Sequence, residues 1–324
     1  MADICYTDAK HTDIGVLRGA KLDLEYGDAG NDFELTLSAS SDYRIASGAY
    51  VYVEGSEWGG VVDACETNTK TGNIIYKGRS WQGVLEDKIL EPNSGEDYLK
   101  VSGDANAVIR NLIARLGLNS VFKASKAFSD ITITSYSFDR YCTAFEGLRK
   151  MLKTKDARID LSFDSTKGKV LIAAKPITKY YDAANSDLSE VQIKRVIRPY
   201  NHLIALGKGE LKNRIVLHFY ADEKGNVSTT QTLFGLDERT LTYDYSNAER
   251  DELESGGIKR LREYQSADII KVTLDDAKEF ALDDVVYGTD IISGLSVSAS
   301  VGTKIVVITD TDCSISYKAG GVVI

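Results

Sequence analysis

The chain has 324 residues, of which 43% are hydrophobic, 27% charged and 9% aromatic, a composition typical of a folded protein with a sizeable core. This length exceeds what one hydrophobic core usually organises and predicts two or three domains. The formal net charge of −9 argues against binding to nucleic-acid phosphates as the main activity, because such binding needs clustered Lys and Arg.

The N-terminus has no basic start followed by an apolar run, and no window of about 18 apolar residues occurs in the chain. We therefore expect neither a secretory signal peptide nor a membrane-spanning segment. The four cysteines, Cys5, Cys65, Cys142 and Cys313, lie far apart and form no CxxC pair, which predicts reduced, mostly buried thiols.

Residues 19–55 alternate between apolar and polar side chains. Leu22 and Leu24 share one face of the first run, as Phe33, Leu35 and Leu37 do in the next, and residues 26–32 between them are rich in turn formers. The pattern predicts consecutive β-strands.

Residues 57–90 contain two further β-rich runs, each with one of the two tryptophans, Trp58 and Trp81. A polar cluster at 68–73 separates the runs, so we interpret them as neighbouring strands of a β-hairpin rather than as helix. Both tryptophans are predicted to be buried structural anchors of this first β unit. Replacing either with Ala is then expected to cost about 3 to 5 kcal/mol.

The period changes after Pro92. Apolar residues from Val108 to Leu116 share one helical face, with Ser102 or Asp104 as the start and Gly117 as the stop. The spacing from Tyr141 to Leu152 predicts a second helix, and residues 156–176 predict a hairpin with its turn at 164–168.

Strand patterns return at 203–206 and 215–220, followed by a turn at 223–226. A helix is predicted over 246–265, with Asn247 as its cap and Leu253, Leu261 and Tyr264 on one side. Gly256 and Gly257 weaken this helix by about 1 kcal/mol each. Residues 269–324 again read as strands.

These patterns predict a β-rich α+β fold with two small β-barrel-like units, an α/β insert and a helical insert. We assign residues 1–92 to the first β-barrel-like unit and 93–182 to the α/β insert. The second β-barrel-like unit takes residues 183–240 and 267–324, and the helical insert takes 241–266.

Residues that carry catalytic or metal chemistry are not clustered in the sequence. His11, His202 and His218 are isolated from one another and from every cysteine, so we expect no metal site, no cofactor and no catalytic residue. The adjacent acids Asp283 and Asp284 are interpreted as exposed turn residues. We therefore expect a protein that is not an enzyme.

The order of several motifs resembles that of phage tail hub or baseplate hub proteins, in particular the siphophage Gp37-like family. The motifs are WGGVVDACETN, YKGRSWQGVLEDKIL, SGDANAVIRNLIARLGL, NHLIALGKGEL and the region from DDVVYGTD to ISYKAGG. Related chains often place Gly where this chain has Asp283, which leaves the geometry of that turn open.

The resemblance implies a structural phage or prophage protein, a homotrimeric ring that joins the sixfold tail tube to the threefold tail tip or spike. The implied partners are a tail tube or distal tail protein, a tape-measure protein and a spike or fibre protein, and DNA passes through the lumen without specific binding. The protein is then made in the bacterial host cytoplasm and located at the virion tail tip or baseplate. Two alternatives remain: the hub of a contractile phage or phage-tail-like bacteriocin, and a carbohydrate-binding or adhesion protein that uses some of the 18 tyrosines.

Overall fold

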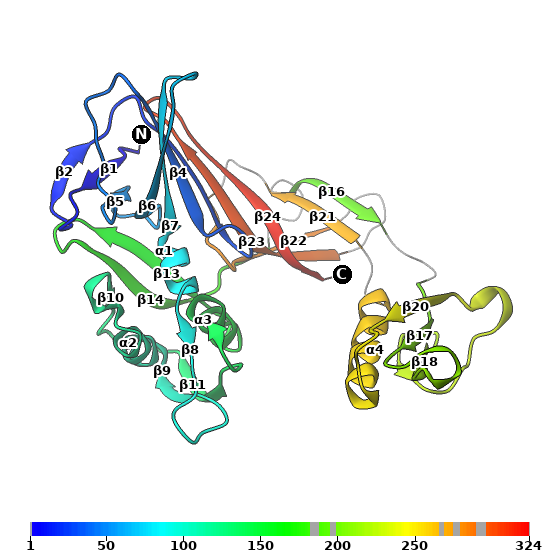
Figure 1. The fold of residues 1–324 in the computed structure, drawn as a ribbon. Coiled ribbons are helices and arrows are strands. Elements are labelled where there is room, and N and C mark those ends of the chain that lie inside the picture. Colours follow the sequence, from blue (N-terminus) through cyan, green and yellow to red (C-terminus); the bar gives the residue numbers. More distant parts are fainter. Residues whose placement is uncertain are drawn as a thin grey trace. The chain divides into compact units, whose positions relative to one another are not determined.

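The computed structural model describes residues 2–181, 188–194, 199–265, 269–274, 279–289 and 296–323. Contacts divide the chain into two compact units (Figure 1). The large unit comprises Met1–Glu190 and Val272–Ile324, and the small unit comprises Val191–Lys271.

The N-terminal part of the large unit consists of strands and one short helix: β1 (Cys5–Thr7), β2 (Asp13–Val16), β3 (Lys21–Gly27), β4 (Asp32–Ser38), β5 (Tyr50–Tyr52), β6 (Gly59–Asn68), β7 (Asn73–Ser80), α1 (Trp81–Glu86) and β8 (Ile89–Leu90). The middle part adds β9 (Lys100–Asp104), α2 (Ala105–Arg115), β10 (Phe122–Ala124), β11 (Thr132–Ser137), β12 (Cys142–Thr143), α3 (Ala144–Lys153), β13 (Ala157–Asp164), β14 (Lys169–Pro176) and β15 (Lys179–Tyr180). The C-terminal part adds β22 (Val285–Thr289), β23 (Ser296–Ile308) and β24 (Cys313–Val323).

One large sheet dominates this unit. Its strand order is β15-β22-β23-β3-β4-β7-β6-β5-β1-β2, with β24 paired to β23, and in the described residues its two ends do not pair to close a barrel. The predicted alternation in β3 and β4 is confirmed, because Leu22, Leu24, Phe33, Leu35 and Leu37 are all buried. The β-rich α+β class is therefore confirmed.

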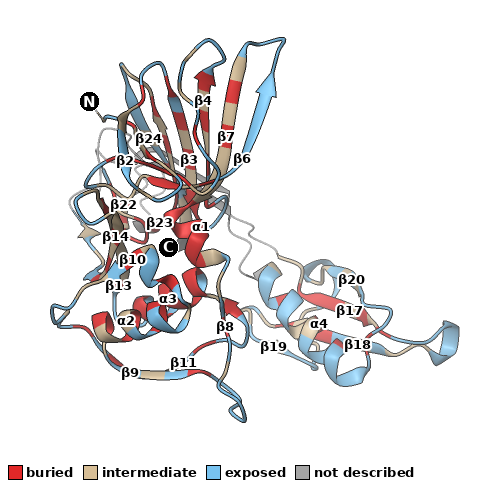
Figure 2. Ribbon diagram, turned by 60° about the vertical axis from the view of Figure 1, so that its left-hand side comes forward, coloured by how far each residue is buried: buried red, intermediate tan, exposed pale blue. Residues whose placement is uncertain are grey.

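The hairpin expected at 57–90 is present as β6 and β7, but the prediction was wrong beyond Ser80. Residues 81–86 form helix α1, because the Ser80 side chain caps the helix by accepting from the Gly83 amide at 3.2 Å. Figure 2 shows α1 almost wholly buried. A short helix that is buried on nearly all sides has no amphipathic period, which explains why the pattern was taken for strand.

Helices α2 and α3 pack in the largest core cluster with β13 and β14. Asp104 caps α2 and Gly117 follows it with φ 69°, as the sequence predicted. The second helix begins later than expected, at Ala144 after the Thr143 cap, and leaves Tyr141 exposed.

The C-terminal strands group differently from our sequence-based division. We assigned residues 267–324 together with 183–240, but β23 pairs with β3 from Thr303↔Gly27 to Ile308↔Leu22. The chain end is thus built into the sheet of the first β unit. Pairing between segments this far apart is decided by register, which a local pattern does not contain.

The small unit is a four-stranded sheet covered by one helix. Buried Leu203, Phe219, Leu253 and Leu261 form the centre of its core.

No helix in the described residues of the chain is both long and apolar enough to cross a membrane. The elements between β15 and β22 are β16 (Leu188–Lys194), β17 (His202–Leu206), β18 (Val216–Ala221), β19 (Val227–Ser228), β20 (Thr240–Asp244), α4 (Arg250–Gln265) and β21 (Ile269–Leu274).

Candidate functional site

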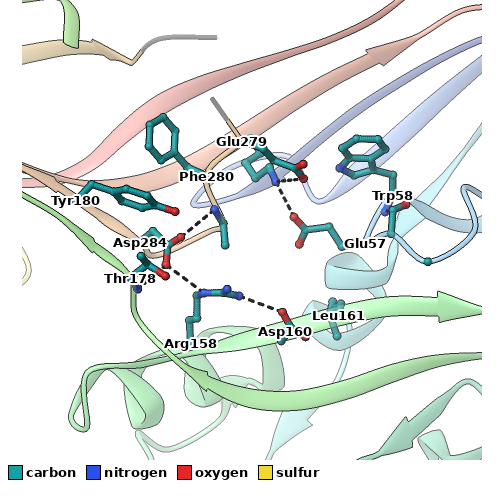
Figure 3. Close-up of a pocket in the computed structure, with 14 residues that line it drawn as sticks. Glu57, Trp58, Arg158, Asp160, Leu161, Thr178, Tyr180, Glu279, Phe280 and Asp284 are labelled. Carbon is teal, nitrogen blue, oxygen red and sulfur yellow. Dashed lines mark hydrogen bonds and ion pairs between the residues drawn. The ribbon is translucent and has the colours of Figure 1, made fainter. Parts of the chain in front are cut away.

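A pocket of about 440 Å³ lies in the large unit between β13 and the strands of the large sheet (Figure 3). Segments far apart in sequence line it: the turn after β5, strand β13, two residues at β15, the segment before β22 and one residue of β23. The lining residues are Gly55, Ser56, Glu57, Trp58, Arg158, Asp160, Leu161, Thr178, Tyr180, Glu279, Phe280, Ala281, Asp284 and Lys304.

The turn after β5 is fixed to β13 at one end of the pocket. The Phe163 amide donates to the Ser56 carbonyl at 2.8 Å, and the Gly55 amide donates to the Phe163 carbonyl at 3.0 Å. The Ser56 hydroxyl donates to the Val53 carbonyl at 2.8 Å and accepts from the Trp58 amide at 3.1 Å. These bonds hold Glu57 and Trp58 at the rim.

A buried lysine faces this turn. The Lys304 side chain is 1% exposed, and its Nζ donates to Glu57 Oε1 at 2.8 Å. The Tyr26 hydroxyl also donates to that carboxylate oxygen, at 2.9 Å. Burial lowers the pKa of Lys304, but Glu57, together with Tyr317 and Glu279, raises it, and the pKa lies above its ordinary value. Lys304 therefore stays charged at neutral pH.

Asp284 closes the opposite end of the pocket. Its Oδ1 accepts from Arg158 Nε at 3.1 Å and from the Thr178 amide at 2.9 Å, and its Oδ2 accepts from the Ala281 amide at 3.1 Å. Burial raises the pKa of Asp284 above its ordinary value, and these hydrogen bonds offset only part of that effect.

The neighbouring Asp283 lies in a different electrostatic environment. Arg149 donates to both of its oxygens, at 2.9 and 2.6 Å, and Lys153 Nζ lies 2.8 Å from Oδ1. Burial raises the pKa of Asp283, but these cations outweigh burial and hold it below its ordinary value. Asp283 has φ 71°, the left-handed conformation that glycine adopts easily, which answers the question the resemblance left open at this turn.

The expectation that these two acids are exposed was wrong. Asp283 is 2% exposed and Asp284 is 1% exposed. Their cationic partners lie 134 and 126 residues away in the chain, so nothing in the local sequence indicates the burial.

The small unit contains a second polar cluster that the sequence analysis missed. His202 Nδ1 lies 2.6 Å from Glu238 Oε1, and His202 Nε2 lies 2.9 Å from His218 Nδ1. A carboxylate only accepts, so His202 Nδ1 donates, and the Nε2 of a neutral His202 accepts from His218. The hydrogen bond from His202 lowers the pKa of Glu238.

The prediction that the histidines are isolated from one another was thus wrong for His202 and His218. The register pairs His202 with Tyr220 and Ile204 with His218, so the two histidines are diagonal neighbours on one face of the sheet. Their positions on adjacent predicted strands were the available signal. One hydrogen bond therefore joins the facing nitrogens of the two rings.

The two predicted anchors differ in burial. Trp81 is fully buried in α1, where its ring stacks on Phe163 at 5.5 Å between centroids and meets Tyr50 edge-on at 5.2 Å. Trp58 is half-buried, packs against a different core cluster and lines the pocket. Their contribution to stability stays a prediction.

The cysteine prediction needs correction. All four thiols are free, but only Cys142 is buried, while Cys65 and Cys313 are exposed and Cys5 is half-buried. Where no other element packs on a strand, both polar and apolar side chains are found there. The spacing of the cysteines in the sequence therefore did not indicate which thiols are exposed.

The residues that the structure describes contain no group of three or more His, Cys, Asp or Glu side chains arranged to hold a metal ion. The six charged side chains lining the pocket each lie within 3.9 Å of an opposite charge. The charged side chains of the pocket are thus paired with one another.

No family model matches the chain, and no curated protein matches it. Among solved structures, it is similar to prophage tail protein gp18 from Listeria monocytogenes EGD-e, with a TM-score of 0.50, 11% identity and coverage of 98% of this chain and 94% of that one. It is also similar to the 43 kDa tail protein of prophage MuSo2 from Shewanella oneidensis, with a TM-score of 0.48, 13% identity and 98% coverage of both chains. The tail protein from Neisseria meningitidis MC58 gives a TM-score of 0.45, 12% identity and coverage of 98% and 96%. The first likeness shows a common fold.

Proposed function

We propose that this chain is a structural protein of a phage or prophage tail and acts as its hub. The observation that carries the proposal is the common fold with the Listeria monocytogenes prophage tail protein, which spans 98% of this chain. The ordered motifs from WGGVVDACETN to ISYKAGG support the same assignment. Fold and function are separable in principle, so the role needs its own test.

The hub proposal includes a homotrimeric ring between a sixfold tail tube and a threefold tip. Strand β24 supports assembly, because it lies at an edge of the sheet and, in the described residues, pairs with no strand other than β23. An open edge is a ready template for pairing, and addition of a subunit is one way to cover it.

The ring would enclose a lumen through which DNA passes without specific binding. The formal net charge of −9 supports this, because like charge keeps a polyanion from sticking to the wall. On the sheet face where Asp23 lies opposite Glu34 and Glu25 opposite Asp32, lysines pair with three of these four acids. The partners we propose are a tail tube or distal tail protein, a tape-measure protein and a spike or fibre protein, at the virion tail tip or baseplate.

The mass in solution tests the ring. We expect light scattering coupled to size exclusion to give three times the 35.5 kDa chain mass, and negative-stain images of that peak to show rings. A single-chain mass at every concentration, with no gold-labelled antibody bound to the tips of particles from the producing strain, would contradict the hub. Gold label at the base of a contractile sheath would instead favour the alternative in which the chain is the hub of a contractile phage or phage-tail-like bacteriocin.

We further propose that the chain has no catalytic activity. Incubation with purified peptidoglycan is expected to release no soluble muropeptides, with lysozyme as the positive control. Release that is abolished by heat denaturation of the chain would refute this part of the proposal and leave the ring test unaffected.

A further inference from the structure

Strand β13 is an edge strand: it pairs with β14 along one side, and within the described residues no strand pairs with its other side. On β14, the Val170 amide donates to the Val121 carbonyl and the Ile172 carbonyl accepts from the Ser125 amide, so both residues bond toward β10. Their partners across the β13–β14 ladder are Phe163 and Leu161. Because an antiparallel ladder alternates, the N–H and C=O groups of these β13 residues point away from β14.

This outer edge is closed at Phe163, which exchanges both backbone bonds with the turn after β5. The next outward residue, Leu161, makes no backbone bond on this side within the described residues. The Ile159 carbonyl accepts only a long 3.4 Å bond from Arg158 Nη1.

The open groups lie against the pocket, and Leu161 is part of its lining (Figure 3). Leu161 is only 7% exposed, so an unpaired N–H or C=O here costs free energy unless something in the pocket bonds to it. A volume of about 440 Å³ is in the range of ligand sites. A ligand that satisfies an outward N–H and C=O pair must itself present an acceptor and a donor at strand spacing.

The charges of the side chains that line the pocket determine which charge on the ligand is favoured. Four carboxylates line the pocket, at Glu57, Asp160, Glu279 and Asp284, against two cations. Glu279 is 67% exposed and lies 3.9 Å from Lys304, which already donates to Glu57 at 2.8 Å. Glu279 therefore remains the carboxylate best able to pair with an incoming cation.

We propose that this pocket binds a short extended peptide segment of another protein, which adds as a strand to the open edge of β13 and presents a Lys or Arg side chain to Glu279. Strand addition draws its affinity from backbone hydrogen bonds and its specificity from alternate side chains. The open edge between Ala157 and Ser162 accommodates three to four residues at about 3.4 Å each.

Binding is tested on the full chain with a positional-scanning library of acetylated, amidated peptides of about seven residues, read by fluorescence polarisation. We expect selection of Lys or Arg at one position and of β-branched residues two positions away. A selected peptide that is N-methylated at alternate amides should bind at least about tenfold more weakly, because each methyl removes a backbone donor. Absence of any selection up to about 1 mM total peptide would overturn the proposal.

Two matched pairs of variants locate the site. Ile159→Pro removes a backbone N–H that points away from β14, and no hydrogen bond of the β13–β14 ladder uses this N–H. Proline is therefore compatible with this edge position. Ile159→Val is the matched control, because it keeps the N–H. We expect only the proline variant to weaken binding, by about tenfold, with circular dichroism unchanged. Glu279→Lys should weaken the selected peptide several-fold and favour its acidic counterpart, whereas Glu96→Lys, on an exposed loop, should not.

If the proline variant fails to fold, the charge-reversal pair and the N-methylated peptide still decide the question. Binding that is indifferent to N-methylation and to Glu279→Lys would place the peptide elsewhere and overturn the proposal. If the pocket holds only water and binds no peptide, no residue is selected at any position of the library, and the proposal is overturned.

Discussion

The large and small units use polar contacts differently. In the large unit, the ion pair between Lys304 and Glu57 joins residues 247 positions apart and is nearly closed to solvent on the lysine side. In the small unit, the bond between His202 and His218 joins adjacent strands only 16 positions apart. Buried charge in the large unit fastens the C-terminal strands to the N-terminal sheet, whereas the small unit is held together locally. Proteins rich in non-local contacts fold more slowly, so the large unit should fold last.

The largest test of this contrast is Asp283→Ala. It leaves the Arg149 guanidinium, whose side chain is 9% exposed, without its main partner, and we expect a loss of about 3 to 5 kcal/mol in the free energy of unfolding. The measurement is urea denaturation with hydrogen exchange to assign the loss to the large unit.

Asp139→Ala is the matched control, because its pair with Lys150 is exposed at both ends and should contribute at most about 1 kcal/mol. Equal losses for the two variants would contradict the importance of burial for the Asp283 pair.

Trp81→Ala tests the packing that supports the same unit. Full burial and stacking on Phe163 predict a loss of about 3 to 5 kcal/mol, measured by thermal and urea unfolding. Trp58→Ala should cost less, because Trp58 is half-buried. The reverse order would show that the turn after β5, not α1, anchors the sheet.

Gly257→Ala probes the small unit. An added Cβ would lie 2.5 Å from the Phe219 ring, so we expect a net loss of about 1 to 3 kcal/mol despite the better helix propensity of Ala. Gly256→Ala is the control, since its Cβ would meet only the Tyr243 side chain, at 3.2 Å. Hydrogen exchange of α4 is the readout, and a stabilised Gly257→Ala would refute the tight contact.

The smallest expected effect is a difference in how the contributions of Asp283 and Asp284 to stability depend on pH. The folded-state pKa of Asp283 is lowered, so its stabilisation is present above the unfolded pKa near 3.9 and is lost as pH falls through the folded pKa. The folded-state pKa of Asp284 is raised, so its contribution is present below the unfolded pKa and is lost as pH rises through the folded pKa.

Urea denaturation at several pH values from neutral to acidic, with Asp283→Asn and Asp284→Asn, measures both contributions. As pH falls, the stability of the natural chain relative to Asp283→Asn should decrease, and its stability relative to Asp284→Asn should increase. Parallel trends would mean that the two carboxyls share one environment.

Features set by local pattern could be predicted from the sequence. The period of two in β3 and β4 and the capped amphipathic face of α2 were recognisable because neighbours in the chain determine them. The helix at Trp81 escaped because six residues with five of them buried show no period. The pocket escaped as well, because segments near residues 57, 158, 284 and 304 meet only through sheet register.

The ribbon formed by β16 and β21 has a consequence for how such chains diversify. The two strands pair with each other as a two-stranded sheet, so the chain enters and leaves residues 191–271 through adjacent strands. Genetic exchange at two neighbouring points in the fold would therefore replace the whole small unit and leave the covalent order of the large unit intact. The small unit is in this sense a cassette, free to change its sequence while the buried ion pairs constrain the rest.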